Sequence, residues 1–433
     1  MSSFFWYIVA TQHINVPPKL AIHIQKCYIF SFMKYKITEI KQGTVTSPQG
    51  FLAGATEAAV KYKGRLDLGI LYSEKPCTSA AVFTGNKVKA APILVSMKNM
   101  EKGKVRAILA NSGCANACTG DKGLKDANET AGLVAAKLGI PRTQVIVAST
   151  GVIGTNMPLK RIEAGIGKII LTKDGGHKLE KAIMTTDTRP KEIAVKVTDS
   201  VGQYVIGGIA KGAGMIHPNM ATLLGFLTTD ASVEISFLRK VLKTAVDNTI
   251  NMVTIDGDTS TNDMVSIMAN GAADTEEITG KNGKNFQEAL NYVCQFLARS
   301  IAADGEGATK LIEVSIEGAK SATDAKKIAR TIAGSSLVKS AIHGNDPNWG
   351  RIVAALGRSG AAMEEKYVDV FLQDEPMMRQ GSPLPFDKNK LSKKLKTGEV
   401  KIRVCLNIGS GKAVAWGCDL SQEYVTINSD YTT

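Results

Sequence analysis

The sequence predicts a layered α/β fold, and three observations carry this prediction. Apolar runs with strand character alternate with helical segments along most of the 433 residues. Apolar runs such as Val105–Asn111 and Val145–Ala148 end in polar loops that contain glycine, and Gly139 and Pro141 mark the end of one helical segment. A hydrophobic content of 44% with 21% charged residues is typical of a globular chain, and the length suffices for two core-forming units.

The part of the chain before position 222 is predicted to alternate between short strands and helices. Threonine and valine bounded by proline and glycine predict short strands and turns over Gly43–Phe51. Small and apolar residues at helical spacing predict helices over Asp126–Leu138 and Leu159–Ile170. The other predicted strands are Val105–Asn111, Val145–Ala148, Ile193–Val197 and Tyr204–Ala210.

The same alternation begins again at position 222, and no sequence repeat is evident. The predicted strands are Thr222–Thr228, Lys310–Glu317, Glu399–Asn407 and Ala413–Trp416, and the predicted helices are Ile235–Val246, Asn285–Ala302, Ala322–Ile332 and Asn348–Leu356. The basic run Lys388–Lys396 predicts the start of a solvated helix. Alternation that begins at Tyr424 predicts a strand-like tail that ends at Thr433.

Residues 1–36 differ in composition from the rest of the chain. They are rich in aromatic residues and lysine, contain no acidic residue and no arginine, and are interrupted by Pro17 and Pro18. Mitochondrial presequences are rich in arginine, and a membrane span needs a longer uninterrupted apolar run. We therefore expect an appended segment outside the core, a cytoplasmic protein, and no membrane partner.

The formal net charge of +13 raises the question of nucleic-acid binding. A nucleic-acid interface needs a basic stripe with interleaved aromatic residues, and the sequence shows no such stripe. The charge instead favours attraction of small anions such as glutamate, so no nucleic-acid partner is expected.

Seven cysteines without regular pairing indicate a reducing compartment rather than a disulfide scaffold. Cys114 and Cys118 have the spacing of half a metal site, but no second close pair accompanies them. We expect buried thiols and no bound metal.

One threonine follows a glycine-rich loop and opens an apolar run. The stretch reads Lys-Gly-Ala-Gly-Met-Ile-His-Pro-Asn-Met-Ala-Thr and spans residues 211–222. A threonine hydroxyl needs an adjacent base, and cleavage before Thr222 would supply the residue's own α-amine, whose ordinary pKa is about 7.7–8.0. On local grounds alone, a tight turn followed by a buried strand is the competing interpretation.

Several motifs together resemble those of the ornithine acetyltransferases, also called bifunctional glutamate N-acetyltransferases, of arginine biosynthesis. In chain order they are Ala148–Gly154, Thr185–Thr188, Lys211–Thr222, Asp256–Asp263, Asp304–Lys310, His343–Arg351 and Asn428–Thr433. The resemblance extends from about Ile37 to Thr433. It implies a layered α/β sandwich of the autoprocessed type that aminopeptidases share.

The resemblance also implies how the chain is processed. Cleavage between Ala221 and Thr222 would give an α chain of residues 37–221 and a β chain of residues 222–433. The active site would form between the two chains, and the assembly would be a heterotetramer with two copies of each.

The resemblance further implies site residues. Thr222 is the nucleophile, and Thr150 and Gly151 form the oxyanion hole. The implied substrate-binding residues are Thr185, Lys211, Thr222, Glu306, Asn428 and Thr433. In this picture Lys211 faces a substrate carboxylate and Glu306 faces its amine. The competing interpretations are an ordinary turn for Thr150 and Gly151, a surface lysine for Lys211, a structural strand end for Thr185, and a disordered tail for Asn428 and Thr433.

The remaining polar motifs receive smaller roles. Asp256, Asp258 and Asp263 do not match a calcium loop, because glycine is absent from its sixth position and glutamate from its twelfth, so structural hydrogen bonding is expected. The glycines beside Glu306 lack the spacing of a phosphate-binding loop. His217 and His343 are assigned no catalytic role. Arg189 stands where the family often has an aromatic residue.

The resulting hypothesis is transfer of acetyl from N-acetylornithine to glutamate through an ester on Thr222, with no metal or organic cofactor. The sequence leaves open whether acetyl-CoA is a second acetyl donor. One alternative is an autoprocessed aminopeptidase or amidase, in which water accepts the acyl group. The other is a basic nucleic-acid-binding protein with no need for Thr222.

Overall fold

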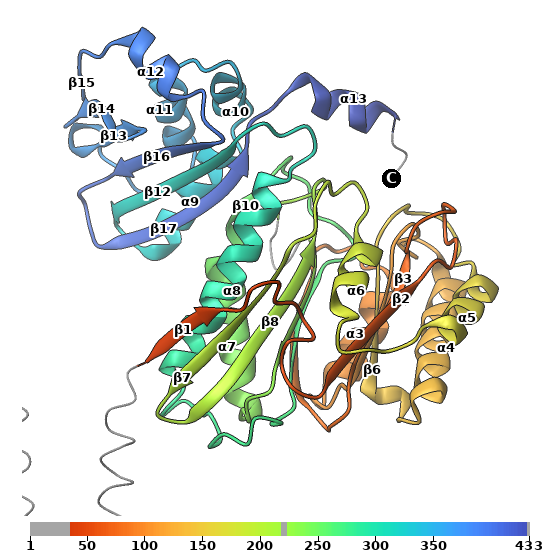
Figure 1. Ribbon diagram of the computed structural model, residues 1–433. Helices are drawn as coiled ribbons and strands as arrows, with labels where there is room; N and C mark the ends of the chain where they lie inside the picture. The colour runs from red at the N-terminus through yellow and green to blue at the C-terminus, as the bar shows by residue number, and fades with distance from the viewer. Residues whose placement is uncertain (1–34, 218–222, 431–433) are drawn as a thin grey trace, which may run out of the picture.

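The computed structural model describes residues 35–217 and 223–430, which form three β-sheets with helices packed on them (Figure 1). The central sheet has six strands in the order β1-β7-β8-β9-β11-β4. These are β1 (Lys36–Glu39), β7 (Glu192–Asp199), β8 (Gly202–Lys211), β9 (Leu224–Thr229), β11 (Met264–Ala269) and β4 (Thr78–Phe83). β9 and β11 run parallel, with Leu224 opposite Met264, and the other pairs are antiparallel.

A second, four-stranded sheet has the order β2-β3-β5-β6. Its strands are β2 (Phe51–Thr56), β3 (Leu68–Ser73), β5 (Ala107–Asn111) and β6 (Val145–Ser149). The β5–β6 pair is parallel, so both strands end at the same edge, one at Asn111 and the other at Ser149. The loops that follow these two strands therefore leave the sheet side by side.

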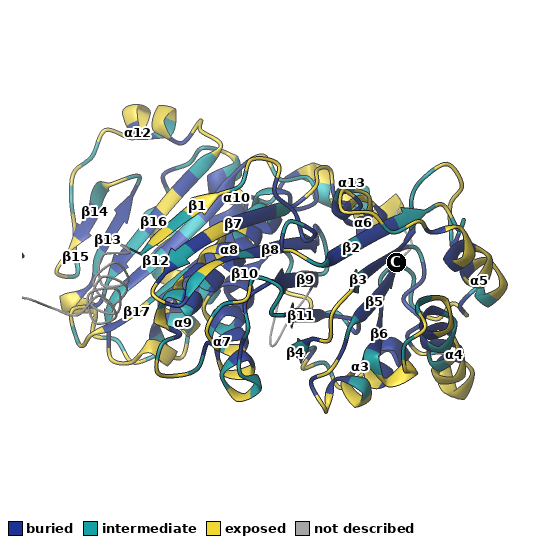
Figure 2. Ribbon diagram, turned by 60° about the horizontal axis from the view of Figure 1, so that its bottom comes forward, coloured by how far each residue is buried: buried dark blue, intermediate teal, exposed yellow. Residues whose placement is uncertain are grey.

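The two sheets pack face to face through a shared apolar cluster. Leu71 and Ile146 come from the four-stranded sheet, and Phe226 and Met268 from the central sheet. Helices α4 and α5 cover the outer face of the four-stranded sheet, and α7 and α8 cover the outer face of the central sheet. Figure 2 shows these strands as buried and the outer sides of the helices as exposed. The helices of this part are α3 (Ala91–Met100), α4 (Gly120–Leu138), α5 (Leu159–Lys168), α6 (Gly176–Ile183), α7 (Ile235–Asn248) and α8 (Lys284–Ala303).

The third sheet lies toward the C-terminal end and has seven strands in the order β10-β17-β12-β16-β13-β14-β15. They are β10 (Val253–Thr254), β17 (Gly411–Cys418), β12 (Leu311–Ala319), β16 (Glu399–Cys405), β13 (Asp369–Leu372), β14 (Glu375–Arg379) and β15 (Ser382–Pro383). The helices are α9 (Ala322–Ala333), α10 (Ser336–His343), α11 (Trp349–Gly357), α12 (Lys388–Lys394) and α13 (Gln422–Asp430). Short 3-10 helices lie at Arg142–Gln144, Ile250–Met252 and Glu365–Tyr367.

The layered α/β prediction is confirmed, and most predicted elements lie within a few residues of their observed bounds. The helix predicted over Asp126–Leu138 begins earlier, at Gly120, and ends as predicted at Gly139, whose φ of 64° is left-handed. β9 begins at Leu224, two residues after the predicted start at Thr222, which lies outside the described residues. The sequence prediction missed several elements, namely β1, β3, β4, β10, β11, β13, β14, β15, α3, α6 and α10.

The prediction of short strands and turns over Gly43–Phe51 was right for the turns and wrong for the strands over most of that range. These residues form turns, and β2 begins only at Phe51. The turn is closed locally, because the Ser47 N–H donates to the Thr44 carbonyl over 3.0 Å and the Thr44 N–H donates to Ser47 Oγ over 2.9 Å. The Ser47 hydroxyl thus satisfies the local backbone, whereas the buried hydroxyls of Thr44 and Thr46 have no hydrogen-bond partner among the described residues.

The prediction of a strand-like tail from Tyr424 was also wrong, because residues 422–430 form helix α13. Ser421 caps its start by accepting the Tyr424 N–H at 3.3 Å, a signal typical of a helix N-terminus. Within the helix, the Asn428 side chain donates to the Tyr424 carbonyl one turn earlier. An alternating pattern needs a partner strand, and the tail has none among the described strands. Residues 431–433 lie outside the described part.

The expectation of buried thiols holds for four described cysteines, namely Cys77, Cys114, Cys294 and Cys418. It was wrong for Cys118, which is exposed, and Cys405 is half-buried. Cys118 lies in the loop before α4, where it has a left-handed φ of 56°. Across residues 35–217 and 223–430, no helix combines the length and apolarity that a membrane span requires.

A buried carboxyl on α6 makes the stability depend on pH. Burial raises the pKa of Glu180 from 4.5 to about 8, and its Oε2 has no hydrogen-bond partner among the described residues. Between pH 4.5 and 8 the folded state keeps a proton that the unfolded state has released. The free energy of unfolding therefore falls as pH rises, by up to about 1.4 kcal/mol per pH unit.

We expect Glu180→Gln to flatten this dependence, since an amide has no proton to lose in that range. Urea unfolding from pH 4.5 to 8 measures it. Glu163→Gln, at an exposed position on α5, is the matched control and keeps the wild-type slope. Equal slopes in Glu180→Gln and the wild type would contradict the prediction.

Candidate active site

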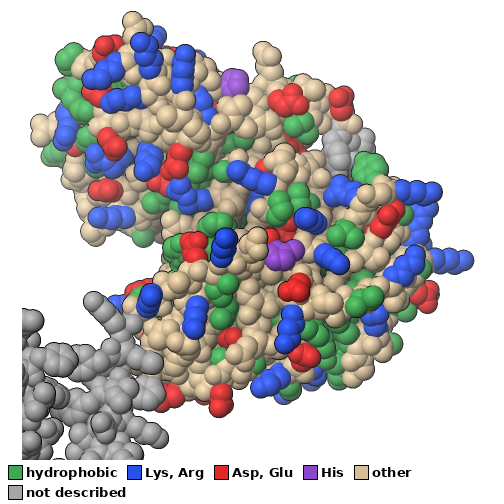
Figure 3. Space-filling model, in the orientation of Figure 1, with side chains coloured by type: hydrophobic (Ala, Val, Ile, Leu, Met, Phe, Trp, Pro, Cys, Tyr) green, Lys and Arg blue, Asp and Glu red, His purple; other side chains and the backbone are tan. Residues whose placement is uncertain are grey.

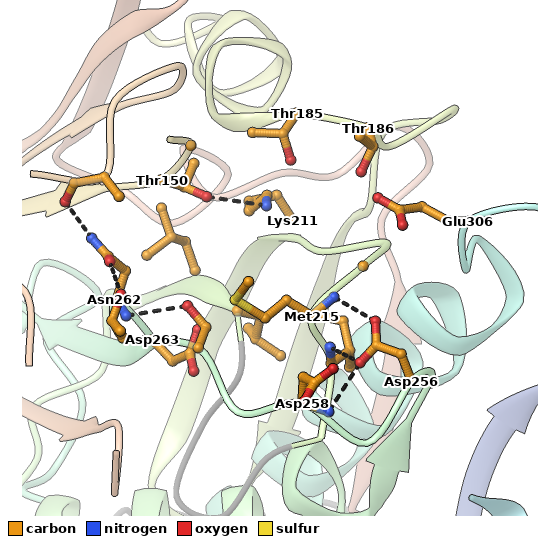
Figure 4. Close-up of a pocket in the computed structure, with 18 of the residues that line it drawn as sticks. Thr150, Thr185, Thr186, Lys211, Met215, Asp256, Asp258, Asn262, Asp263 and Glu306 are labelled. Atoms are coloured by element: carbon orange, nitrogen blue, oxygen red, sulfur yellow. Dashed lines mark hydrogen bonds between the residues drawn. The ribbon is translucent and has the colours of Figure 1, made fainter. Parts of the chain in front are cut away.

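A cavity of about 260 Å³ lies where loops from all parts of the chain meet (Figure 4). Its lining includes every sequence-predicted site residue that the structure describes, namely Thr150, Gly151, Thr185, Lys211, Glu306 and Asn428. The predicted residues Ala221, Thr222 and Thr433 lie outside the described residues. Leu223, the residue after Thr222, and Leu224 also line the cavity.

The loop after β6 supplies the predicted oxyanion hole. Gly151 has a φ of 130°, and a Cβ added there would lie 2.4 Å from the Gly113 carbonyl carbon. Only glycine fits this position without displacing the neighbouring loop. The Thr150 N–H donates to the Asn111 carbonyl at 3.0 Å, and Asn262 Nδ2 donates to the Ser149 carbonyl at 2.9 Å. These bonds fix the loop at the edge of the cavity.

Lys211, at the end of β8, determines how the Thr150 hydroxyl is used. Lys211 Nζ lies 3.3 Å from Thr150 Oγ1 (Figure 4). An ammonium group only donates, so the hydroxyl accepts from it and its own hydrogen can point elsewhere. The Gly151 N–H has no acceptor among the described residues. The Thr150 hydroxyl and the Gly151 N–H can thus both donate to a bound molecule, and the Lys211 ammonium group lies beside them. This arrangement is suited to stabilising a developing oxyanion.

The Lys211 side chain is buried, with 7% of the residue exposed. Burial lowers the pKa of Lys211, and the carboxylates of Asp187, Asp263 and Glu306 counteract this, whereas the charge of Lys191 adds to it. The buried ammonium is therefore surrounded mainly by acidic groups. The interpretation of Lys211 as one more surface lysine is excluded.

Glu306 reaches the cavity from the loop after α8. Its N–H donates to the Ala213 carbonyl at 2.9 Å, and a Cβ on Gly214 would lie 2.4 Å from the Glu306 carboxyl carbon. The Glu306 carboxyl group thus lies directly against the backbone at Gly214, in the loop before the predicted cleavage site. Asn428 Nδ2, from α13, donates to Glu306 Oε2 at 2.8 Å. The C-terminal helix thus contributes directly to the cavity.

Thr185 lies in the loop between α6 and β7. Its N–H donates to Asp187 Oδ2 at 3.0 Å, and its side chain lines the cavity. Figure 4 shows Thr185 and Thr186 across the cavity from Met215 and the Asp256–Asp263 segment. The hydroxyl of Thr185 is thus placed to contact a bound molecule.

Asp256 has the structural role expected of it. Its carboxylate accepts the N–H groups of Met215 at 2.6 Å, Ile216 at 2.9 Å and Asp258 at 3.1 Å. Met215 has a φ of 56°, so this carboxylate holds a strained turn at the end of the glycine-rich loop.

Asp263 meets the same expectation in part, because its carboxyl group is hydrogen-bonded to Ser260 but one of its oxygens is left without a partner in the described part of the chain. It is 3% exposed, and its Oδ2 has no hydrogen-bond partner among the described residues. Burial raises the pKa of Asp263 well above its ordinary value. Asp263, Asn262 and Tyr424 line the cavity without having been predicted as site residues. The Asp256–Asp263 motif was the available signal for the first two, and Tyr424 gave none.

The two histidines flagged in the sequence have structural partners. His217 Nδ1 lies 2.9 Å from Thr254 Oγ1, and burial lowers the pKa of His217 to about 4, so the ring is neutral at pH 7. His343 Nδ1 lies 2.7 Å from Asp419 Oδ2. Within residues 35–217 and 223–430, no group of three or more His, Cys, Asp or Glu side chains could hold a metal ion.

The surface gives no support to nucleic-acid binding on the face shown in Figure 3. Lysine and arginine side chains there are interspersed with aspartate and glutamate rather than gathered in one stripe. The layered α/β fold and a small cavity lined by hydroxyls, one buried ammonium and carboxylates together define an enzyme site for a small charged molecule.

Comparison with known proteins identifies the family. The sequence profile of the ArgJ family matches residues 52–433, so the chain belongs to the ArgJ family, as the resemblance predicted. It is 52% identical over 405 residues to the arginine biosynthesis bifunctional protein ArgJ of Dehalococcoides mccartyi, covering 93% of this chain and 100% of that protein.

Two solved structures are also similar. One is the ArgJ protein of Bacillus halodurans, with 44% identity and a TM-score of 0.46, over 47% of this chain and 97% of that one. The other is an ornithine acetyltransferase from Mycobacterium tuberculosis in complex with ornithine, with 39% identity and a TM-score of 0.40, over 43% of this chain and 100% of that one.

The geometry of the loop predicts that Thr150→Ala lowers kcat by about 10²–10³, the usual effect of losing one oxyanion donor. KM should change little, because the hydroxyl acts on the transition state. Initial rates of the transfer reaction proposed below measure both constants. Thr155→Ala, at an exposed position in the same loop and outside the cavity, serves as the control and keeps wild-type turnover. Unchanged kcat in a correctly processed Thr150→Ala protein would require another donor.

Proposed function

We propose that the chain cleaves itself between Ala221 and Thr222 and then transfers acetyl from N-acetylornithine to glutamate, as an enzyme of arginine biosynthesis. One observation carries the proposal: residues from five distant segments, after β6, after α6, at the end of β8, after α8 and in α13, converge on one cavity. Membership in the ArgJ family supports the same reaction.

The proposed reaction is a double displacement. The α-amine of Thr222 takes the proton of its own hydroxyl, and Oγ attacks the acetyl carbonyl of N-acetylornithine. The oxyanion is held by the Thr150 hydroxyl and the Gly151 N–H. The carbon–nitrogen bond breaks, ornithine leaves with its amine protonated, and an acetyl ester remains on Thr222. The amine of glutamate then attacks this ester, and N-acetylglutamate leaves as Thr222 recovers its proton.

Charged groups in the cavity fit the amino-acid substrates. Lys211 is the proposed partner of the substrate carboxylate, and Glu306 that of its amine. Asn428 Nδ2 donates to Glu306 Oε2. Glu306 Oε1 has no hydrogen bond to the described residues, so this oxygen can accept a hydrogen bond from an ammonium group. Thr185 and Thr433 complete the proposed binding set.

The proposal also covers the subunit composition of the cleaved protein, its location and a second acetyl donor. The α chain of residues 37–221 and the β chain of residues 222–433 would assemble as a heterotetramer with two copies of each, in the cytoplasm. Acetyl-CoA is proposed as a second acetyl donor, which the description of the relatives as bifunctional supports. The reaction needs no organic cofactor or metal.

One assay separates the possible activities. Purified protein is incubated with N-acetylornithine alone, with N-acetylornithine and glutamate, and with acetyl-CoA and glutamate. N-acetylglutamate in the second mixture is the expected result, and its appearance in the third shows use of acetyl-CoA. Acetate in the first mixture, with no N-acetylglutamate in the second, would indicate the aminopeptidase or amidase alternative.

Processing provides a direct prediction. The wild-type protein should give two fragments with masses that correspond to cleavage between Ala221 and Thr222, because the nucleophile needs its α-amine as base. Thr222→Ala should stay intact and inactive. Mass spectrometry of the intact protein and the exchange assay test this together. An uncleaved wild-type protein with full activity would refute the mechanism.

The charge of Glu306 provides a second prediction. Glu306→Gln should raise the KM for N-acetylornithine roughly 10- to 100-fold, since a hydrogen bond to a charged group contributes about 1.5–3 kcal/mol. Glu423→Gln, exposed on α13, is the control and keeps the wild-type KM. A wild-type KM in Glu306→Gln would mean that another group binds the amine.

A further inference from the structure

A fully buried ion cluster lies beside the cavity. Lys191, just before β7, has its Nζ 2.7 Å from Asp187 Oδ1 and 2.5 Å from Asp304 Oδ2. The side chains of Lys191 and Asp187 are 0% exposed, and that of Asp304 is 3% exposed. Lys191 itself is absent from the cavity lining, so no contact with a substrate follows from its position.

Asp187 connects the cluster to two cavity segments. Its Oδ2 accepts the Thr185 N–H at 3.0 Å, and its Oδ1 accepts the Gly212 N–H at 2.7 Å. Thr185 lines the cavity, and Gly212 follows Lys211, which also lines it. One carboxylate thus fixes the backbone at Thr185 and next to Lys211.

Asp304 connects the cluster to a third segment. It lies two residues before Glu306, in the turn that follows α8. Its carboxylate accepts the Thr188 N–H at 3.1 Å and the Thr188 hydroxyl, and Arg189 Nε lies 3.7 Å from Oδ1. Arg189 therefore adds a second cation to Asp304.

The ammonium of Lys191 is the element that keeps the two carboxylates together. Two carboxylates buried this deeply repel each other and are costly to remove from water unless a cation lies between them. Burial alone would raise the pKa of Asp187, but the charges of Lys211 and Lys191 hold it at about 2, so Asp187 stays ionised. Loss of the Lys191 charge would remove the cation that contacts both carboxylates, and either could then move, although Lys211 still acts on Asp187 and Arg189 on Asp304.

We propose that Lys191 is a positioning residue for the acetyl transfer: through Asp187 and Asp304 it holds the segments that carry Thr185, Lys211 and Glu306 at fixed distances from one another. This inference rests on the proposed function. The cluster makes no direct contact with Thr150 or Gly151 within the described residues, but Lys211 lies 3.3 Å from Thr150 Oγ1, so displacement of the Lys211 segment would lower kcat as well as raise KM.

A second ion cluster in the same protein supplies the control. Arg299, on α8, bridges Glu313 and Glu399, and its Nη2 lies 3.0 Å from the carboxylate oxygens of Glu399. None of these three side chains lines the cavity. Removal of this cation also leaves two carboxylates without a cation, with Trp416 Nε1 still donating to Glu313, and it does so away from the proposed substrate contacts.

The experiment compares Lys191→Met with Arg299→Met. For both, cleavage, Tm, and the KM and kcat values with N-acetylornithine and glutamate are measured. We expect both to lower Tm, and Lys191→Met alone to raise both KM values, with a fall in kcat/KM on the order of 10²-fold, the size expected for misplaced substrate contacts. Its kcat should fall less than its kcat/KM.

Asp187→Asn tests the same inference with a smaller change, should Lys191→Met fail to fold. The amide has the shape of the carboxylate but donates on one side, so it loses either the Thr185 contact or the Gly212 contact, and both KM values should again rise. Wild-type KM values in the folded, cleaved variants would overturn the inference, as would an equal KM rise in Arg299→Met. A wild-type protein without acetyl transfer would instead overturn the proposed function.

Discussion

The need to compensate buried ammonium groups organises this cavity. Lys211 and Lys191 are both buried, and a buried cation is stable only beside carboxylates or other acceptors. The carboxylates that face them come from the loop after α6, from the loop after α8 and from the start of β11. These segments are far apart in the sequence, so charge compensation draws them to one place. The same groups that satisfy the lysines then define the polar lining of the cavity.

The layered packing determines where that place lies. Strands β5 and β6 are parallel, so the loops after Asn111 and Ser149 emerge together, and Gly151 lies against Gly113. Ligands often bind in α/β proteins at such carboxyl ends of parallel strands. In the neighbouring sheet, β8 ends at Lys211 and β9 begins at Leu224, so the segment that joins them begins and ends at the cavity. Sheet stacking thus brings the loop after β6 and the two ends of this segment together.

The sequence predicted what depends on local pattern and missed what depends on tertiary contacts. Gly139 ends α4 as predicted, because a left-handed cap is a property of that position alone. The tail after Tyr424 could not be predicted as a helix from its alternation, because the absence of a partner strand is a fact of the whole fold. Lys191 likewise looked like any lysine, since its partner Asp304 is 113 residues away. The motif that contains Asp263 was visible, but the missing partner of its carboxylate was not.

Helix α13 shows how the site and the fold depend on each other. The helix has no buried residue over Gln422–Asp430. It is held by Ser421 Oγ, which donates to the Gly307 carbonyl at 2.6 Å, and by Asn428, which donates to Glu306. A segment with so little buried surface has low local stability, so these contacts at the Glu306 loop decide its position. An ammonium group that binds Glu306 Oε1 would fix the carboxylate in the position in which Oε2 accepts from Asn428 Nδ2. Occupancy of the site and order of the C-terminal helix are therefore thermodynamically linked, and each stabilises the other.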